Sequence, residues 1–252
     1  MKLLNTNDFK NFCEEVRNKK RKDINIKVCI TGCRAKGAID LYTELKKKEN
    51  KDIEVIPVGC HKFCSGAPVV KVDFPNENYH YQNVSIDDVD KIIKNAKKYK
   101  PVEELLFKNK KFFELQEIKV LKYCGEVNPV SIEDYIYYGG FSAFIKILEN
   151  FTPEMVTDEI RKSKLRGRGG AGFPTYKKWE IVKEQKSEEK YVICNGDEGD
   201  HGAFMDRTIL EGLHFQVIEG MLICGFTVGA KKGFFYIRAE YPIAVEHVQK
   251  AI

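Results

Sequence analysis

Two closely spaced cysteine pairs limit what this chain can fold into more than any other feature. The pairs share a spacing of three intervening residues: Cys29 with Cys33, and Cys60 with Cys64. Each pair follows a short run rich in β-branched residues, residues 24–30 and 53–58, which predicts a β-strand. Loops at two neighbouring strand ends can bring four sulfur atoms to one site. We therefore expect a fold that places these two strand ends side by side.

Four thiolates form a soft ligand set, which suits an iron–sulfur cluster, a structural zinc ion or copper(I). Glycines next to the pairs, Gly32, Gly59 and Gly66, allow the backbone to approach closely and direct amides at cluster sulfides. The main alternative is a four-coordinate zinc site, and a third is a set of buried structural cysteines without metal. Spacing alone favours the cluster and leaves all three interpretations open.

Composition excludes several other classes of protein. The 252 residues are 43% hydrophobic and 31% charged, as in an ordinary globular protein. No apolar run approaches the roughly 20 residues of a membrane span, and the N-terminus becomes polar too early for a signal peptide. We therefore expect a cytoplasmic protein without direct membrane insertion. The net charge of +5 comes from scattered lysines without an aromatic-interleaved basic stripe, so nucleic-acid binding is not expected.

Residues 1–98 predict a first α/β unit with the element order α-β-α-β-β-β-α. Its helices are expected at 7–20, 35–48 and 86–97, and its strands at 24–30, 53–58, 69–74 and 79–84. The last two strands form a hairpin across the turn-rich segment 75–78, and Ser85 is placed to cap the last helix. This unit contains both cysteine pairs.

Residues 99–128 predict a charged connector with short strands near 112–120, and a second unit follows over residues 129–252. Ser131 and Thr152 are placed to cap helices, with Pro153 at a first helical position. The further elements expected in this unit are helices at 132–138, 141–149, 152–163, 177–182 and 207–227, strands at 191–194 and 233–238, and a helix from 242.

Two loops of the second unit have the composition of ligand-binding segments. Gly167 to Gly172 fits G-x-G-x-x-G, but no strand precedes it, so a common dinucleotide-binding fold is not expected. Its backbone amides, with nearby Arg166, Arg168 and Lys178, can still hold a phosphate or a ring edge, whereas a flexible basic linker is the alternative. The segment 195–200 follows a strand, where α/β sheets place ligands; an acidic surface turn or a hard-cation site is the alternative.

The remaining four cysteines and His61 are not expected to bind a metal or a cofactor directly. Cys194 and Cys224 have apolar neighbours and are expected in the core, while Cys13 and Cys124 are expected to be structural. His61 lies inside a cysteine loop, and simple exposure is the expectation for its ring.

Motifs along nearly the whole chain resemble one family. Residues 28–37 and 58–70 resemble a thioredoxin-like [2Fe–2S] ferredoxin, although that family usually has four residues inside the first cysteine pair. The second unit resembles the FMN- and NADH-binding (51 kDa-type) subunit of complex I and of soluble NAD(P)-reducing hydrogenases. The segments that carry this second resemblance are 138–141, 165–175, 178–179, 194–198, 205–207, 219–223 and 237–241. Residues 123–129 resemble the connector of the ferredoxin-fused form.

The resemblance implies an α/β chain with a thioredoxin-like ferredoxin domain, followed by the first part of the FMN-binding α/β domain of the complex I flavin subunit. It implies a [2Fe–2S] cluster on the four paired cysteines. Its implied FMN contacts are Gly167, Arg168, Gly169, Gly170, Lys178, Asn195, Asp197 and Glu198. Phe173 would stack on the nicotinamide, and Glu198, as the catalytic residue, would lie near the NAD(P)H riboses with Asp200, where the family often has glutamate.

The implied activity is that of a diaphorase-type NAD(P)H:acceptor oxidoreductase subunit, passing electrons from NAD(P)H through FMN to iron–sulfur clusters. Its partners would be other subunits of a hydrogenase, a formate dehydrogenase or a complex I-like enzyme. Flavin subunits of this family continue well beyond the last matched segment, so residues 129–252 are expected to be an incomplete flavin domain. The alternatives are a non-catalytic [2Fe–2S] electron-carrier fragment and a zinc-stabilised interaction module.

Overall fold

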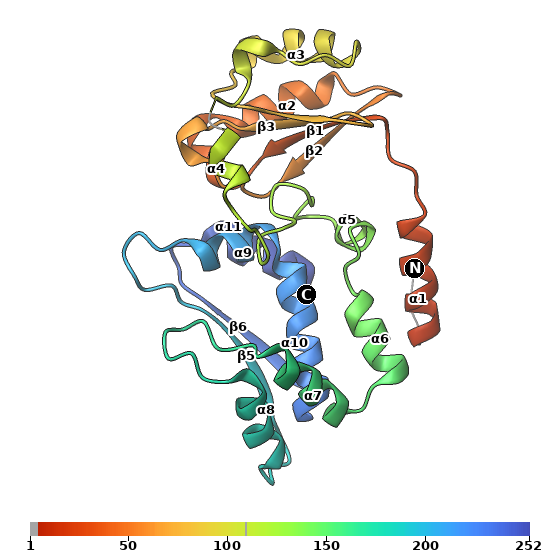
Figure 1. Ribbon diagram of the computed structural model, residues 1–252, viewed down its shortest axis with the longest axis vertical. Coiled ribbons are helices and arrows are strands. Elements are labelled where there is room, and N and C mark those ends of the chain that lie inside the picture. Colours follow the sequence, from red (N-terminus) through yellow and green to blue (C-terminus); the bar gives the residue numbers. More distant parts are fainter. Residues whose placement is uncertain (1–4, 109) are drawn as a thin grey trace.

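The structure is a computed structural model that describes residues 5–108 and 110–252. It is elongated, with a four-stranded sheet and its helices at one end and the second unit at the other (Figure 1). Mixed helices and sheets confirm the expected α/β fold class. The order of elements expected for the first 98 residues is also confirmed.

The first sheet has the strand order β2-β1-β3-β4. Its strands are β1 (Ile24–Cys29), β2 (Ile53–Val58), β3 (Val70–Asp73) and β4 (Asn78–Tyr81). β1 runs parallel to β2, with Cys29 opposite Val58, and antiparallel to β3, which pairs antiparallel with β4. The parallel pair brings the ends of β1 and β2 to the same edge of the sheet. Each of these two strand ends leads into one of the cysteine loops.

Alternation along the strands gives this sheet two different faces. Residues such as Ile26 and Val72 point into a core with α2 (Ala38–Lys47) and α3 (Val89–Ala96). The alternate positions along the same strands point to the opposite face, and they include the buried Lys27 on β1 and Lys71 on β3. The connector covers that second face. Short 3-10 turns complete the unit at Gly32–Lys36, Cys64–Gly66, Ile86–Asp88 and Glu103–Leu105.

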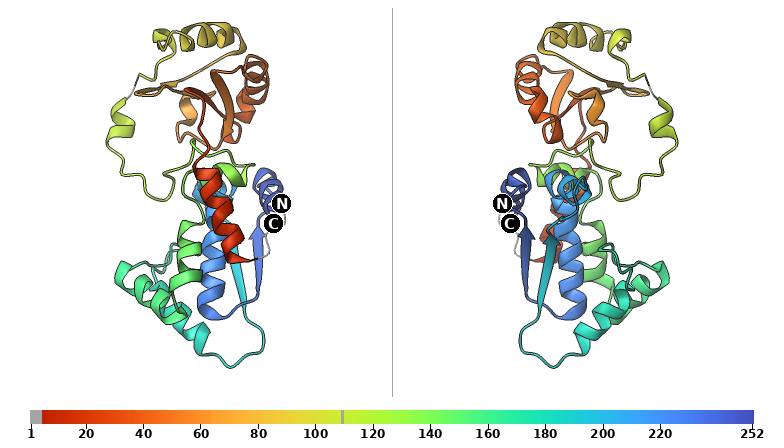
Figure 2. Two further views of the ribbon diagram at one scale, coloured as in Figure 1. Left: turned by 90° about the vertical axis from the view of Figure 1, so that its right-hand side faces the viewer. Right: turned by 90° about the vertical axis from the view of Figure 1, so that its left-hand side faces the viewer.

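Helix α1 (Thr6–Arg17) packs against the second unit (Figure 2). Its buried residues Cys13 and Val16 share a core cluster with Ile136 and Phe141. The Arg17 guanidinium donates to the Gly140 carbonyl at 2.9 Å and to Ser142 Oγ at 2.8 Å. The helix therefore belongs by its contacts to the second unit, although it precedes β1 in the sequence. The division of the chain at residues 98 and 128 stays a prediction.

The second unit places helices around a two-stranded parallel sheet of β5 (Tyr191–Gly196) and β6 (Lys232–Ile237). Its helices are α5 (Ile132–Tyr137), α6 (Ser142–Asn150), α7 (Pro153–Ser163), α8 (Thr175–Glu184), α9 (Met205–Gly212), α10 (His214–Val228) and α11 (Pro242–Ala251). The caps on Ser131 and Thr152 are confirmed, since each hydroxyl accepts a backbone amide of its helix. Ser85 and Asp88 form the expected capping box.

Two predictions about elements are wrong. Strands were expected near 112–120, but the connector forms helix α4 (Lys110–Glu114) followed by turns. Phe113, on α4, stacks on His80. The single helix expected over 207–227 is two helices, bent by 93° at Leu213. Gly212 packs there against the backbone of Gly59, and a straight helix would not make this contact.

No single helix in residues 5–108 and 110–252 is long and apolar enough to span a membrane. Together α9 and α10 would meet that test of length and composition, but the sharp bend separates them.

Candidate metal and cofactor sites

Three of the four paired cysteines meet where β1 and β2 end. Cys29 closes β1, Cys33 lies in the 3-10 turn that follows, and Cys60 follows β2. The neighbouring Cys33 and Cys60 thiols lower the pKa of Cys29 well below that of a free thiol. The Cys29 side chain, followed by burial, raises the pKa values of Cys33 and Cys60. The three side chains belong to one small cluster at this edge of the sheet.

Cys64, the fourth cysteine, is exposed in its 3-10 turn. Across the described residues, no group of three or more His, Cys, Asp or Glu side chains is arranged to hold a single metal ion. The structure thus gathers three predicted ligands and leaves the fourth at the surface beside them.

The donor set fits an iron–sulfur cluster by its chemistry. Four cysteines are the ligands of a [2Fe–2S] cluster, and a stabilised thiolate is the form in which cysteine binds iron. The amide of Lys62 lies 3.2 Å from Cys60 Sγ, which is an N–H contact to a ligand sulfur. Such contacts tune the potential of a cluster. The four cysteines stay the predicted ligands.

His61 corrects one prediction, because its ring is buried and only 4% exposed. It packs edge-on against His80 with ring centres 5.7 Å apart. Burial lowers its pKa to about 4 and keeps the ring neutral near pH 7. Its Nε2 atom has no hydrogen-bond partner among the residues that the structure describes. The sequence carried no signal for this burial, which depends on the connector folding over the cysteine loop.

The glycine-rich loop closes on itself and presents its tip to solvent. The amide of Gly167 donates to the Phe173 carbonyl at 2.9 Å, and that of Thr175 donates to Leu165 at 3.1 Å. Arg166 Nε donates to Gly172 at 2.6 Å. The predicted contacts Gly167, Arg168, Gly169 and Gly170 are exposed, and so are Phe173 and Lys178. Helix α7 precedes this loop and α8 follows it, which confirms that no strand enters it.

The acidic loop after β5 divides into an exposed part and a buried part. Asn195, Asp197 and Asp200 are exposed, and Asn195 Oδ1 accepts the amide of Asp197 at 3.0 Å. Among the hydrogen bonds and ion pairs of residues 5–108 and 110–252, each of the two loops is held by bonds of its own.

Glu198 is the buried member of this loop. Its carboxylate accepts the amides of Asp206 at 3.1 Å and Arg207 at 3.2 Å. It also accepts the Tyr241 hydroxyl at 3.1 Å. These bonds satisfy amides at the start of α9, where a negative charge is favourable. Its predicted catalytic role stays a prediction; in the structure it caps a helix.

Helix α9 links the acidic loop to the cysteine loop. It begins at the Glu198 cap and ends at Gly212, and a Cβ placed on Gly59 would lie 3.0 Å from Gly212 Cα. Gly59 directly precedes Cys60. Eight helical residues span about 12 Å, at 1.5 Å per residue. In Figure 1, α9 lies at the end of the second unit that faces the first sheet. One short helix therefore separates the two predicted sites.

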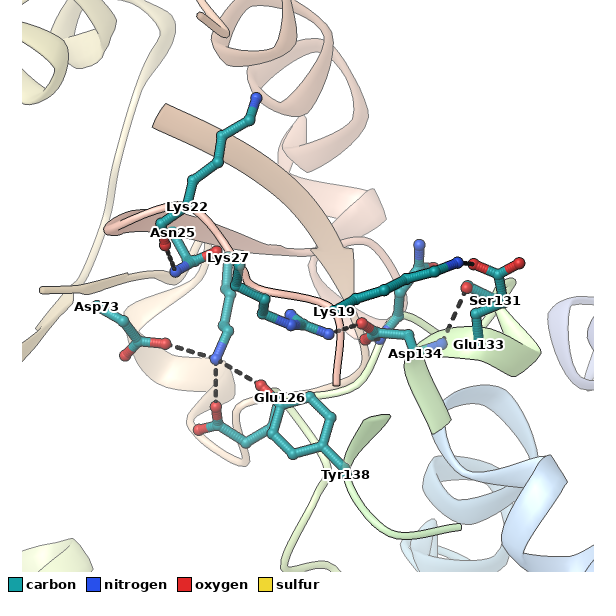
Figure 3. Close-up of polar contacts among 12 residues, drawn as sticks. Lys19, Lys22, Asn25, Lys27, Asp73, Glu126, Ser131, Glu133, Asp134 and Tyr138 are labelled. Atoms are coloured by element: carbon teal, nitrogen blue, oxygen red, sulfur yellow. Dashed lines mark hydrogen bonds and ion pairs between the residues drawn. The ribbon is translucent and has the colours of Figure 1, made fainter. Parts of the chain in front are cut away.

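A buried charge cluster joins the first sheet to the connector and was not anticipated. Lys27 contacts Glu126 and Asp73 (Figure 3). Lys71 contacts the same two carboxylates. Burial alone would raise the pKa of Glu126, but the two ammonium groups outweigh it and lower the pKa to about 2. Strand alternation could have placed both lysines on one face, but nothing local identified their partner.

A large cavity in the described part of the chain has a lining distinct from both predicted sites. It is an apolar groove of about 750 Å³ between α6, α10, α11 and the β5–β6 sheet, with Leu148, Val192 and Phe235 in its lining. Its lining includes none of the predicted site residues.

Comparison with known proteins finds relatives for the second unit. Residues 160–252 match the protein family described as the Nuo51 FMN-binding domain. The NADP-reducing hydrogenase subunit HndC of Solidesulfovibrio fructosivorans is 50% identical over 129 residues, which cover 51% of this chain and 26% of the relative. A subunit of the NADH-quinone oxidoreductase of Aquifex aeolicus is 45% identical over 133 residues, covering 53% of this chain and 31% of the relative. The matches thus span less than a third of either relative.

Solved structures show weaker likeness. An NAD⁺-reducing [NiFe]-hydrogenase in the air-oxidised state covers 96% of this chain and 43% of its own, at 20% identity and a TM-score of 0.43. A thioredoxin-like [2Fe–2S] ferredoxin from Aquifex aeolicus covers 34% of this chain and 91% of its own, at 24% identity and a TM-score of 0.31.

Proposed function

Because residues 160–252 match the Nuo51 FMN-binding domain family, we propose that this chain is a subunit of an NAD(P)H:acceptor oxidoreductase. It would pass electrons from NAD(P)H through FMN to a [2Fe–2S] cluster on Cys29, Cys33, Cys60 and Cys64. Relatives named as hydrogenase and quinone-oxidoreductase subunits support this activity. They also support partners from a hydrogenase or a complex I-like enzyme, while a formate dehydrogenase partner stays a prediction. We expect it to work in the cytoplasm.

One observation carries the proposal beyond the family match. Helix α9 runs from the Glu198 cap in the predicted flavin loop to the contact between Gly212 and Gly59, beside Cys60. This contact supports the proposal, because it brings one residue of the proposed flavin loop within one short helix of a proposed cluster ligand. Bound FMN would supply the chemistry, by accepting two electrons from NAD(P)H and releasing them singly.

The residues of the protein would bind and orient FMN and NAD(P)H. The exposed Gly169 and Gly170, with Arg168 and Lys178, are proposed to hold the flavin phosphate, and the Gly167 amide closes the loop by its bond to Phe173. Asn195 and Asp197 can hydrogen-bond the flavin ribityl chain or ring. Phe173 offers an exposed ring for stacking on the nicotinamide, and Glu198 and Asp200 lie in the loop proposed to face the riboses.

The purified chain tests the proposal. Absorption and electron paramagnetic resonance (EPR) spectra, analyses of iron and sulfide, and flavin extraction establish which cofactors are bound, and NADH-dependent dye reduction measures activity. Cluster, FMN and dye reduction together support the proposal. A cluster without flavin, in the chain supplied with FMN, would instead support the electron-carrier alternative. Zinc without iron would refute both.

A further inference from the structure

Residues 121–126 of the connector contact the second cysteine loop from several directions. Lys62, between Cys60 and Cys64, donates its ammonium group to the Cys124 carbonyl at 3.0 Å and to the Leu121 carbonyl at 3.4 Å. The cysteine loop is thus tied by a side chain to connector backbone that is distant in sequence.

Cys124 supplies the second contact. Its side chain is only 2% exposed, so its sulfur is enclosed between the two chain segments that meet there. The same sulfur would lie 3.3 Å from a Cβ on Gly59 and 3.2 Å from one on Gly212. Cys124 therefore fills the junction where the end of β2 meets the end of α9. It belongs to neither predicted cofactor site but touches an element of each.

Gly125 supplies the third contact. Its φ is +86°, and a Cβ there would lie 2.7 Å from His61 Nδ1. Only glycine lets the His61 ring lie flat against the connector at this point. The next residue, Glu126, is held in place by its ion pairs with Lys27 and Lys71. The connector is anchored to the sheet immediately after it contacts the loop.

From these contacts we infer that Cys124 and Gly125 are positioning residues for the iron–sulfur site. They hold the Cys60–Cys64 loop against α9 and so set the surroundings of the cluster. The inference rests on the proposed cluster. It predicts that changes in the connector, which supplies no ligand, alter the properties of the cluster.

The test compares Gly125→Ala with Gly229→Ala. Gly229 has a similar φ of +78° at the end of α10, and a Cβ there meets nothing within 4 Å, so both variants incur the same backbone strain. We expect Gly125→Ala to shift the midpoint potential and the EPR g-values of the cluster, whereas Gly229→Ala retains wild-type values. Cys124→Ala and Lys62→Met remove the other two contacts and should also shift the potential.

The outcomes separate this inference from the proposed function. A wild-type chain that assembles no cluster overturns both. A cluster whose potential and g-values are the same in wild type and Gly125→Ala overturns the positioning role and leaves the proposed function intact. If Gly125→Ala does not fold, Cys124→Ala and Lys62→Met decide the matter, and wild-type values in both overturn the inference.

Discussion

Glu126 Oε2 lies 2.6 Å from Lys27 Nζ, and this ion pair joins the connector to a buried face of the first sheet. Only 4% of the Lys27 side chain is exposed. Burial works against the charge on Lys27, but Tyr138, Glu126 and Asp73 together raise its pKa. Because both groups are removed from water, each depends on the other to remain charged.

Replacing Glu126 with glutamine should therefore destabilise the chain. The change leaves Lys27 and Lys71 with Asp73 as their remaining carboxylate, and breaking a buried pair costs about 3 kcal/mol. Urea unfolding followed by circular dichroism measures the loss. Glu133→Gln is the control, since its pair with Lys19 is more than half exposed and should change stability by less than about 1 kcal/mol. Equal stabilities of the two variants would contradict the prediction.

Glu219 should be a second stability determinant. Its carboxylate accepts the Tyr135 hydroxyl at 2.5 Å and the amides of Phe141 and Phe144 at 2.8 and 3.2 Å. Glu219→Ala leaves these buried donors unsatisfied and should cost about 3 kcal/mol in the free energy of unfolding. Glu246→Ala, in an exposed pair with Lys250, should cost less than about 1 kcal/mol. Urea unfolding again measures both, and a small effect at Glu219 would show that water replaces the carboxylate.

Glu198 offers a test that separates capping from catalysis. Glu198→Gln removes the charge that holds the amides of Asp206 and Arg207, so it should cost about 1 kcal/mol of stability without any cofactor present. Asp197→Asn in the exposed neighbouring position should have little effect. Denaturant unfolding of the cofactor-free chain gives the comparison. An unchanged midpoint for Glu198→Gln would remove the capping role and leave only a role toward ligand.

His214 should make stability depend on pH. Burial lowers its pKa to about 4 from an ordinary 6.5, and neither ring nitrogen has a hydrogen-bond partner in the described part of the chain. Between these values the unfolded chain binds more protons than the folded one, so stability falls as pH decreases from 6.5 toward 4. His214→Phe should remove about 2 kcal/mol of that decrease. His61, His80 and His247, whose pKa values are also lowered, contribute to the remaining slope, as do carboxyls with lowered pKa values such as Glu126.

Unfolding free energies at pH 7 and pH 4.5 provide the measurement for His214. The exposed His201 serves as the control, and His201→Phe should leave the slope between these two pH values as it is in wild type. A wild-type slope in His214→Phe would show that the ring is protonated inside the fold.

The cysteine ligands can be tested by composition alone. Cys29→Ser removes the sulfur that packs between the two cysteine loops with Cys33 and Cys60, and we expect iron and sulfide content to fall to background. Cys224→Ser, on α10, should keep the wild-type content. Full iron content in Cys29→Ser would exclude Cys29 as an essential ligand.

Local signals in the sequence predicted the elements that depend on local interactions. Alternation identified β1 and β2, and Ser131 and Thr152 marked helix starts because their hydroxyls bond amides three residues away. The failures depend on distant contacts. The break at Leu213 follows the meeting of Gly212 with Gly59, which no helical pattern can encode. The burial of His61 has the same origin, since the residue that covers it is Gly125.

The candidate sites divide in the same way. Each cysteine pair lies where a predicted strand ends, and a helix was predicted between the two strands. Strands joined by a helix usually pair in parallel, so the ends of β1 and β2 were expected to adjoin, and they do. The role of Glu198 at the start of α9 could not be predicted. Capping patterns in a sequence join residues about three positions apart, whereas α9 begins seven residues after Glu198. The glycine-rich loop was predicted as backbone that holds a phosphate or a ring edge, and the structure shows its residues 167–170 exposed.

Helix α1 has a consequence for how the chain is made. It leaves the ribosome before the strands of the first sheet, yet Arg17 bonds Ser142, 125 residues later in the chain. Its apolar side, with Cys13 and Val16, therefore stays uncovered throughout synthesis of the whole first sheet. Domains generally fold in the order of synthesis, and contacts across long stretches of chain form slowly. The first sheet can thus assemble during translation, while α1 is the last part of the first 98 residues to find its place.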